Sequence, residues 1–553
     1  MVWVAAPVPE AAAGLERAGL PAWLSLLLAR RGVADAAGAD RFLKPSLDQL
    51  HDPFLLAGME EAVCRLVEAR NRGEKVAIVG DYDVDGISAT AQLLAVFARC
   101  GLAAVPILPH RLREGYGFQP VHVERAKAEG CRVIVTADCG SSSATAVEAA
   151  LAAGMAVVIT DHHLPGCELP PAALHINPRQ ERCTYPFRDL AAAGLALKLA
   201  LAFAERCGKA VDPSVLLRIA CLGTIADLVP LHGENRVIAA LGLTAMVGTR
   251  SHGLKALIQQ SGMKPPFTAA DIGFRIGPRI NAAGRLHDPE RALELLMSRD
   301  AGRAFELAQD LDVWNRERQT AEARVVEEAR RRFAARSPLP PILVEWSADW
   351  HKGVVGVAAG RVAKEFHRPV VLLAAEGESA TGSGRSVPGL ELHAFLSPWK
   401  ERMARFGGHA QAVGLTAEVA RLPELRREWE EAGAAWPAEL LARRYEYELH
   451  LAPREVTGAL LAQLAALEPF GQGNARPLVR TGPLRLMGEP RLFGNGHLSA
   501  RARGEDGATV ELVGWRWQER VGNLRGSFEV LACVEFDSYR GGPVLRLVDS
   551  RPA

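Results

Sequence analysis

Three short apolar segments, each followed by an acidic or histidine-rich turn, constrain the fold of this chain more than any other feature. They are VAIVG at 76–80, VIVTA at 133–137 and AVVIT at 156–160. Each has the length and the β-branched composition of a strand, and the first two lead into apolar sequences of helical length. Strands that alternate with helices predict a parallel sheet with helices on both faces. We therefore expect an α/β domain in this part of the chain.

Acidic and imidazole side chains follow these segments. In open parallel sheets, ligands bind beyond the carboxyl ends of the strands, so we expect these side chains to converge. The set consists of Asp81, Asp83, Asp85, Asp138, Asp161, His162, His163 and, after a later helical segment, Asp227. Carboxylates favour Mg²⁺, and added imidazole moves the preference towards Mn²⁺ or another transition metal. Two ions about 4 Å apart can bind both the attacking and the leaving oxygen of a phosphoryl transfer. The sequence thus predicts a metal-dependent phosphodiesterase.

Each cluster also has a plainer interpretation. Asp138 alone could be the N-cap of the helix that follows it, and a His-His pair on a loop is usually a surface feature. DYDVDG resembles a calcium-binding loop, but it lacks the distal glutamate at EF-hand spacing. Three such clusters at successive strand ends favour the shared metal site.

The length of 553 residues predicts three or four domains. Residues 1–50 have the pattern of short helices, and 51–267 contain the predicted α/β unit. Residues 268–339 are mostly helical and end in a charged stretch, as in a long connecting helix. A second α/β block covers 340–440. Residues 445–553 contain several short β-like runs, which predict a small barrel of the oligonucleotide-binding type.

The charges are balanced, since 65 Lys and Arg face 64 Asp and Glu for a net charge of +1. An anionic polymer would therefore have to bind in a local basic groove. The nine cysteines form no CxxC pair, which argues against a zinc knuckle or a disulfide framework and suits a reducing compartment. The chain begins without a basic, apolar leader and contains no apolar run of membrane-spanning length. We expect a cytoplasmic protein.

Eight motifs point to a known family. They are DYDVDGISA, TADCGSSS, TDHHLPG, GTIADLVPL, GPRINAAGR (277–285), GSGRS (382–386), FGGHAQAVG (406–414) and LEPFGQGNARP (467–477). In this order, and over nearly the whole chain, they resemble the DHH phosphoesterase superfamily, and within it the RecJ branch of single-strand-specific 5′-to-3′ DNA exonucleases. The resemblance implies a DHH catalytic domain at 51–267, a DHHA1-type substrate-binding domain at 340–440 and an OB-fold at 445–553.

The resemblance also implies roles for the clustered side chains. Two ions, Mn²⁺ or Mg²⁺, would be held by Asp83, Asp85, Asp138, His162 and Asp227, with Asp81 as a further candidate ligand. Asp138 would bridge the ions and, with His162 and His163, take part in catalysis. His163 would complete the metal site or touch the scissile phosphate. Asp161 would hold an imidazole in the right tautomer.

Phosphate contacts are expected from a second set of residues. Gly407 and Gly408 would let the backbone approach the strand, and His409 would contact a phosphate. Ser383, Arg385 and Arg111 would form a pocket for the 5′-phosphate, while Arg279 and Arg285 would line the path to the metals. Bases could stack on Tyr116, Phe118, Trp346 or Trp350, although such residues more often pack in a core.

The family resemblance implies a hydrolase that releases 5′-mononucleotides from single-stranded DNA during repair and recombination. A single-strand-binding protein and a helicase would be its partners. Two alternatives are a DHH phosphatase or phosphodiesterase acting on small molecules or short oligonucleotides, and a non-catalytic replication scaffold. The first leaves residues 445–553 without a role, and the second should show replaced ligands, which this sequence does not.

Overall fold

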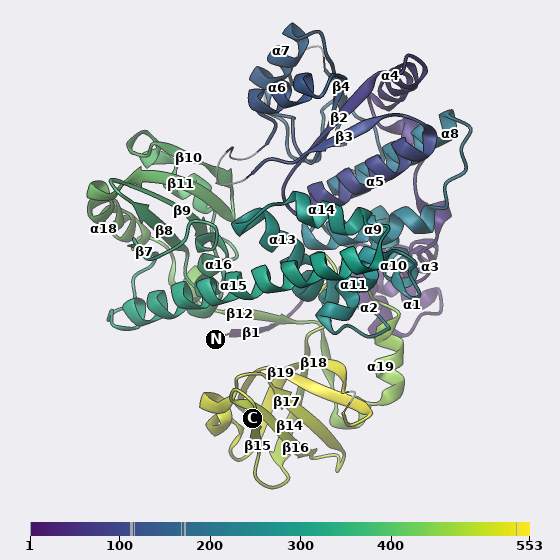
Figure 1. Cartoon of the computed structure of the whole chain (residues 1–553). Coiled ribbons are helices and arrows are strands. Elements are labelled where there is room, and N and C mark those ends of the chain that lie inside the picture. The colour runs from purple at the N-terminus through teal and green to yellow at the C-terminus, as the bar shows by residue number, and fades with distance from the viewer. Residues whose placement is uncertain (1, 111–113, 115–116, 167–168, 171–172, 538) are drawn as a thin grey trace.

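The computed structural model describes residues 2–110, 114, 117–166, 169–170, 173–537 and 539–553. It has three parts (Figure 1): a first α/β lobe, a second α/β lobe and a β-barrel. The helix α15 (Ala301–Ala334), 34 residues long, runs from the first lobe to the second. The predicted fold class, two α/β units joined by a long helix and followed by an OB-type barrel, is confirmed.

The first lobe is built on a five-stranded sheet in the order β3-β2-β4-β5-β6, with all strands parallel. The predicted strands are β2, β4 and β5, whose residues are almost all buried. This is expected where helices cover both faces. Helices α4, α5 and α8 share a core with one face, and α6 and α7 cover the other. The strands are β2 (Lys75–Gly80), β3 (Ala104–Ile107), β4 (Cys131–Ala137), β5 (Ala156–Thr160) and β6 (Leu174–Ile176).

Helices complete the first lobe beyond the sheet. They are α4 (Met59–Asn71), α5 (Val84–Cys100), α6 (Pro120–Ala128), α7 (Ala144–Ala152), α8 (Ala192–Arg206), α9 (Pro213–Ala226), α10 (Gly233–Met246), α11 (His252–Ser261), α12 (Ala269–Asp271), α13 (Gly277–Leu286) and α14 (Glu290–Met297). The core of this lobe continues through α12–α14 to Leu311 on α15. The expected linker at 268–339 therefore packs with the first lobe over its first half.

The second half of α15 belongs to the second lobe. Val325, Val326, Ala329 and Phe333 are buried in the core of that lobe. One continuous helix therefore contributes to two hydrophobic cores. It is too polar to cross a membrane, and no other helix in the described ranges is long and apolar enough to do so.

The second lobe has a mixed sheet in the order β10-β11-β9-β8-β7, in which only β7 and β8 are parallel. Helix α16 packs against one face, and α17 and α18 share a core with the other. The elements are β7 (Leu343–Ser347), α16 (Val355–Phe366), β8 (Val370–Glu376), β9 (Ser379–Arg385), α17 (Leu392–Leu396), β10 (Arg405–His409), β11 (Ala412–Glu418) and α18 (Leu422–Gly433).

The barrel closes through β14, β16, β17, β19 and β18, with β17 and β19 parallel. The N-terminal helices share its hydrophobic core, and β1 pairs with β12. The elements are β1 (Val2–Ala5), α1 (Ala11–Arg17), α2 (Ala22–Arg30), α3 (Ala36–Leu43), β12 (Arg444–Tyr447), β13 (Leu449–Leu451), α19 (Gly458–Ala465), β14 (Val479–Leu486), β15 (Arg491–Phe493), β16 (His497–Gly504), β17 (Thr509–Gly514), β18 (Phe528–Asp537) and β19 (Gly542–Pro552). The first and last segments of the chain thus form one unit.

A buried arginine joins this unit to the first lobe. Arg236 on α10 donates to the carbonyl oxygens of Phe42, Leu467 and Glu468 at 2.8, 3.0 and 2.7 Å. A fourth, longer bond reaches Ala466 at 3.4 Å, and the guanidinium lies 3.8 Å from the centre of the Phe42 ring. Burial lowers the pKa of Arg236 to about 10, so the charge is retained at neutral pH.

We expect Arg236→Leu to loosen this junction, because three well-formed bonds to buried carbonyls would be lost. The cost should be roughly 3 kcal/mol of unfolding free energy. Urea unfolding followed by the fluorescence of the barrel tryptophans measures it. Arg250→Leu, at an exposed position, is the control and should change little. Equal stability of the two variants would contradict the anchoring role.

Candidate metal centre

The carboxyl ends of β2, β4 and β5 bring the predicted ligands together with the C-terminal end of α9. Three groups of side chains each place their ligand atoms within 4.8 Å of one another. The groups are Asp81, Asp83 and Asp138; Asp85, His162 and Asp227; and Asp138, His162 and His163. Asp138 and His162 each belong to two groups, so the side chains form one continuous centre.

Helix N-termini hold two of the carboxylates. Asp83 is the N-cap of α5, and its Oδ1 accepts from the backbone N–H groups of Asp85 and Gly86. Both oxygens of Asp85 accept backbone N–H groups at the start of α8, from Ala192 at 2.7 Å and Ala193 at 2.8 Å. Peptide dipoles favour negative charge at these positions. The carboxylates are thereby fixed before any cation binds.

Close packing against Asp85 explains a glycine in the GTIAD motif. A Cβ atom on Gly223 would lie 2.3 Å from Asp85 Oδ1. Any larger residue at this position would push α9 away from the centre. Since Asp227 ends the same helix, Gly223 also determines how near its carboxylate comes to Asp85.

Asp138 lies at the middle of the centre in a strained conformation. Its φ of 70° is in the left-handed region, which costs a non-glycine residue about 1–2 kcal/mol. The alternative role as a helix N-cap does not apply, because α7 begins at Ala144 with Ser143 as its N-cap. Strained backbone at a cluster of polar side chains is typical of functional sites.

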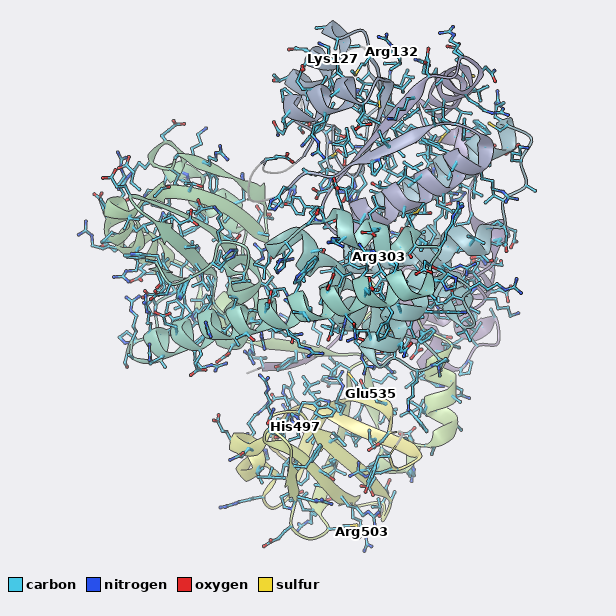
Figure 2. The ribbon with its side chains drawn as sticks, viewed as in Figure 1. Lys127, Arg132, Arg303, His497, Arg503 and Glu535 are labelled. Carbon is cyan, nitrogen blue, oxygen red and sulfur yellow. The ribbon has the colours of Figure 1, made fainter. Side chains whose placement is uncertain are left out.

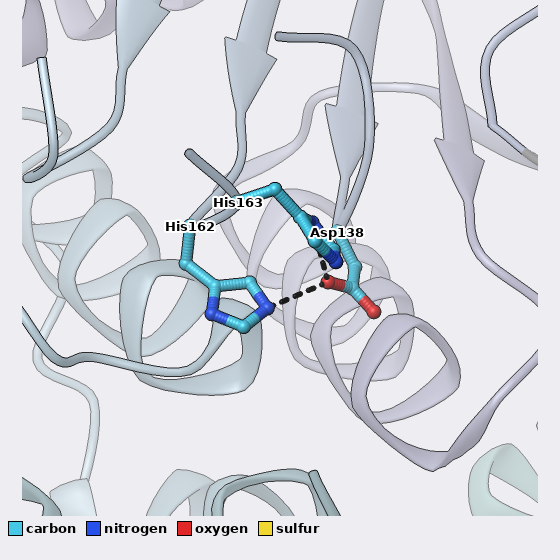
Figure 3. A group of neighbouring side chains, drawn as sticks. All are labelled: Asp138, His162 and His163. Carbon is cyan, nitrogen blue, oxygen red and sulfur yellow. Dashed lines mark ion pairs between the residues drawn. The ribbon is translucent and has the colours of Figure 1, made fainter. Parts of the chain in front are cut away.

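His162 faces three carboxylates, which lie after β4, in the first turn of α5 and at the end of α9. Its Nε2 lies 3.1 Å from Asp138 Oδ1 (Figure 3). The same atom lies 3.6 Å from Asp227 Oδ2 and 3.8 Å from Asp85 Oδ2. Among the described residues, neither His162 Nε2 nor Asp138 Oδ1 makes a hydrogen bond of good geometry, although both atoms are buried. Buried polar atoms that are close but unsatisfied fit a site that a cation completes.

Asp161 orients the second imidazole. Its Oδ1 lies 2.7 Å from His163 Nδ1 and accepts the N–H groups of His162 and His163, while Oδ2 accepts from Ser141. Burial alone would raise the pKa of Asp161, but the bond with His163 holds it at about 2. Burial alone would lower the pKa of His163, but Asp161 raises it to about 9.

In the other side chains of the centre, burial and nearby like charges favour the neutral form. Burial, reinforced by the charge of Asp83, raises the pKa of Asp85 to about 7. Burial and the charge of Asp85 raise the pKa of Asp227 to about 8 and that of Asp138 well above its ordinary value. Burial lowers the pKa of His162 to about 3. Buried carboxylates that repel one another, beside neutral imidazole, are the donor set that a divalent cation stabilises.

A second polar cluster lies on the second lobe. A Cβ atom on Gly356, at the start of α16, would lie 3.0 Å from Ser383 Oγ and 3.4 Å from Arg385 Nη2. The strand register places Arg385, Ala412 and His409 in one row across β9, β11 and β10, and Ser383, Gly414 and Gly407 in another. Opposed residues present their side chains to one face. Ser383, Arg385 and His409 therefore share the face at the N-terminus of α16.

The two lobes meet beside this cluster. A Cβ atom on Gly353 would lie 2.7 Å from the carbonyl oxygen of Arg285, so α13 touches the segment that enters α16. Arg279, predicted to line the path to the metals, is paired with Asp312 on α15 at 2.7 Å. Its contact with DNA stays a prediction. Gly408 has no side chain, which allows β10 to lie close to β11. A Cβ atom on Gly408 would lie 2.3 Å from the carbonyl oxygen of Ala412.

The candidate stacking residues that the structure describes pack in or against cores, which is the commoner role of such residues. Arg111 and Tyr116 lie outside the described residues. Phe118 and Trp350 are buried in cores, and Trp346 is partly buried beneath Arg426. Sequence reasoning missed Asn281, whose Oδ1 accepts from Val84 N in the DYDVDG segment. It also missed the start of α16, for which the two glycines of HKGVVG were an available signal.

Comparison with known proteins identifies the family. Three family profiles match successive parts of the chain: the DHH family, N-terminal domain (75–224), the DHHA1 domain (339–433) and the RecJ OB domain (447–548). The single-stranded-DNA-specific exonuclease RecJ of Dickeya dadantii is 38% identical over 502 residues, which cover 87% of this chain and 86% of that protein. The chain belongs to the RecJ family.

Other RecJ proteins support this assignment. RecJ of Bacillus subtilis is 37% identical over 457 residues, a match that takes in 82% of this chain and 58% of the Bacillus protein. The fold is similar to a crystal structure of RecJ in complex with Mn²⁺ from Thermus thermophilus, with a TM-score of 0.83 and 30% identity. That similarity covers 100% of this chain and 80% of the other. The RecJ resemblance predicted from the motifs is confirmed.

The RecJ OB domain contains the exposed aromatic residues that sequence reasoning did not find. Phe493, Trp515, Phe536 and Tyr539 are exposed, and all four line one cavity of about 490 Å³. Arg491, Arg540 and Arg546 line the same cavity. Glu535 borders it on the side of the barrel that faces α15, whereas Arg503 lies at the far end of the barrel (Figure 2). Arg540 is paired with Asp537 and Arg546 with Glu535, so the exposed aromatic faces are the feature that suits a flexible single strand.

We expect metal-free protein to lose stability as the pH rises from 6.5 to 9. Asp85 and Asp227 have folded-state pKa values of about 7 and 8 against an ordinary 3.8, so only the folded chain holds these protons near neutral pH. Their contribution is lost as the pH rises through the folded values. The pKa of His163, raised from 6.5 to about 9, has the same sign over this range.

Thermal melts of chelator-treated protein across this pH range measure the effect. Added Mn²⁺ should remove most of the fall, because a cation replaces the lost protons. Asp138→Asn should raise the metal-free melting temperature at pH 8 and abolish the Mn²⁺ response. Asp212→Asn, at an exposed N-cap, is the control. A metal-free melting temperature that does not change with pH would contradict this account of the centre.

Proposed function

We propose that this chain is a metal-dependent exonuclease that hydrolyses single-stranded DNA from its 5′ end and releases 5′-mononucleotides, in DNA repair and recombination. The convergence of five aspartates and two histidines in a chain of the RecJ family carries this proposal. The relatives that match over most of the chain are named single-stranded-DNA-specific exonucleases. The small-molecule alternative gives the barrel and its aromatic cavity no role, and the scaffold alternative does not explain the complete ligand set.

We assign the metal site to Asp81, Asp83, Asp85, Asp138, His162 and Asp227, for two Mn²⁺ or Mg²⁺ ions. RecJ of Thermus thermophilus was crystallised with each of these cations, and the mixed donor set suits both. When bound, such ions activate water and stabilise the charge on a phosphate in transfer. Asp138 would be the ligand shared by the ions, because it belongs to two of the three groups and its carboxylate, unlike the imidazole of His162, has two donor oxygens on one group.

His163 has a different role in this scheme. Asp161 Oδ1 lies 2.7 Å from its Nδ1 and fixes the orientation of the ring. Its side chain is 36% exposed, against 8% for His162. The more exposed imidazole is therefore the one placed to contact the scissile phosphate.

The 5′ end would be recognised on the second lobe. The N-terminus of α16, Ser383 and Arg385 gather peptide dipoles, a hydroxyl and a guanidinium at one place, which is a favourable arrangement for phosphate. His409 and the backbone of Gly407 and Gly408 extend the same face along β10. Arg285, beside the entrance to α16, would approach from the first lobe. A terminal phosphate held here would set the direction of digestion.

The barrel would hold the strand further from its 5′ end. Base stacking on an aromatic side chain contributes about 1–3 kcal/mol and needs an unpaired base. Phe493, Trp515, Phe536 and Tyr539 offer such faces. Paired bases in a duplex cannot use them, which favours single strands.

Location and protein partners complete the proposal. The eight cysteines in the described ranges are free, which fits a cytoplasmic protein. A single-strand-binding protein and a helicase are expected partners by family, and co-purification with each is the direct test.

We expect the chain with Mn²⁺ or Mg²⁺ to shorten 3′-labelled single strands from the 5′ end, to release mononucleotides and to leave blunt duplex mostly intact. Asp138→Asn should slow this by at least about 100-fold, because the central ligand is lost. Asp212→Asn should match the wild type. Gel and chromatographic analysis of the products measures both. Digestion from the 3′ end, or equal digestion of duplex, would contradict the proposal.

We expect Arg385→Ala to raise KM for 5′-phosphorylated strands by roughly ten-fold or more, since it removes a charged hydrogen bond to phosphate. KM for strands with a 5′-hydroxyl should change little. Steady-state rates on the two substrates measure the difference. Arg427→Ala, at an exposed position on α18, is the control in the same lobe. An equal effect on both substrates would show that Arg385 does not read the terminal phosphate.

A further inference from the structure

Asp227 is the most exposed of the three carboxylates that face His162. Its side chain is 26% exposed, whereas those of Asp85 and Asp138 are 0% and 3% exposed. Backbone N–H groups fix Asp83, Asp85 and Asp161. Within the described ranges, no such donor reaches the Asp227 carboxylate. The position of this side chain therefore depends on the backbone that follows α9.

That backbone is strained at its first residue. Leu228 has a φ of 61° and is 68% exposed, so its own side chain gains little from burial. A branched residue in the left-handed region persists only where the surroundings hold it there. The next fixed points are Val229 and Leu231, which are buried, and Pro230, whose carbonyl accepts from Asn235 Nδ2 at 3.1 Å.

The barrel domain supplies the remaining support, from the LEPFGQGN motif. Leu231 N donates to Gln472 O at 2.7 Å. A Cβ atom on Gly471 would lie 2.6 Å from Leu231 Cδ1, and one on Gly473 would lie 3.0 Å from Pro230 Cβ. The turn at 471–474 is thus in direct contact with the segment that follows Asp227.

The turn is rigid enough to act as a support. Gly471 and Asn474 exchange backbone hydrogen bonds at 2.9 and 3.2 Å. Asn474 is 1% exposed, and its Nδ2 donates to the carbonyls of Leu467 and Pro469 while its Oδ1 accepts from Arg31. Arg236 holds the carbonyls just before the turn. These contacts tie it to the first lobe and to the N-terminal helices.

We propose that the turn at 471–474 positions Asp227, so that the entrance to the barrel domain helps to set the metal affinity of the centre. The inference rests on the proposed metal-dependent function. The turn is a positioning element, since it touches neither the metal site nor the substrate. A displacement of Pro230 and Leu231 would relax Leu228 and withdraw the Asp227 carboxylate from Asp85 and His162.

Two glycines of equal φ give a matched test in the full chain. Gly473 and Gly526 both have a φ of 70°, and an added Cβ meets Pro230 at the first and nothing within 4 Å at the second. Ala at either position imposes the same backbone strain, and only Gly473→Ala also presses on the segment after Asp227. The metal-free melting temperatures of the two variants should fall by similar amounts, because the backbone strain at the two positions is the same.

We expect Gly473→Ala to weaken Mn²⁺ binding about ten-fold, the lower range for changes behind a metal ligand, and Gly526→Ala to bind as the wild type does. Calorimetric titration of chelator-treated protein with Mn²⁺ measures this without reference to activity. Binding of single-stranded DNA in the presence of chelator should be alike in both variants. Equal Mn²⁺ affinity of the two variants would overturn the inference.

A second variant covers the case in which Gly473→Ala fails to fold. Gly471→Ala needs no left-handed backbone and meets chiefly the side chain of Leu231. Mn²⁺ affinity should fall in this variant and recover in Gly471→Ala with Leu231→Val, where the shorter side chain makes room for the added methyl group. No recovery would count against positioning through this contact. If the wild type bound Mn²⁺ but left single-stranded DNA intact, the proposed function would fail and the positioning result would stand.

Discussion

Mutual repulsion among buried carboxylates is the constraint on which the rest of the structure depends. Five aspartates at one edge of a sheet would separate or take up protons if the chain around them were soft. They are restrained by features that are costly to disturb: the N-termini of α5 and α8, a left-handed backbone at Asp138, and the close packing of Gly223 against Asp85. The folded chain thus carries an unfavourable charge arrangement that a cation relieves.

The remaining parts of the molecule bring a strand to that centre. The second lobe offers the row of polar groups that we propose for phosphate binding, and the barrel offers exposed aromatic faces. Both are fixed relative to the first lobe, by α15 in one case and by the contacts of Arg236 and the 471–474 turn in the other. The spatial neighbours of a segment are not always its neighbours in the sequence. The N-terminal helices, for example, share the hydrophobic core of the C-terminal barrel.

The sequence predicted the structure well where an apolar strand pattern is followed directly by metal-binding residue types. Strands β2, β4 and β5 are continuous apolar runs, and their ends carry the acids, so both the sheet and its ligand cluster could be predicted. The edge strands β3 and β6 are short and were missed, because edge strands lack the long apolar pattern of central ones. Asp138 could be a cap or a ligand from sequence alone. The start of α7 at Ala144 excludes the cap, and the role of metal ligand stays a proposal.

Contacts between distant segments could not be predicted in the same way. The pairing of Arg279 with Asp312 occupies a side chain that the motif suggested for a phosphate contact, and nothing near either residue in the sequence indicates it. The aromatic cavity of the barrel is assembled from residues that are separated by turns and that look ordinary one by one. Such features depend on which segments meet, and a single sequence carries little information about that.

The shared helix has a mechanical consequence. At 1.5 Å per residue, α15 is about 50 Å long, and its two halves are packed into different cores. Moving the two lobes relative to each other would require this helix to bend or one core to slip. We therefore expect the lobes to keep nearly constant positions relative to each other. In that case the DNA strand, and not the lobes, would have to move between successive cuts.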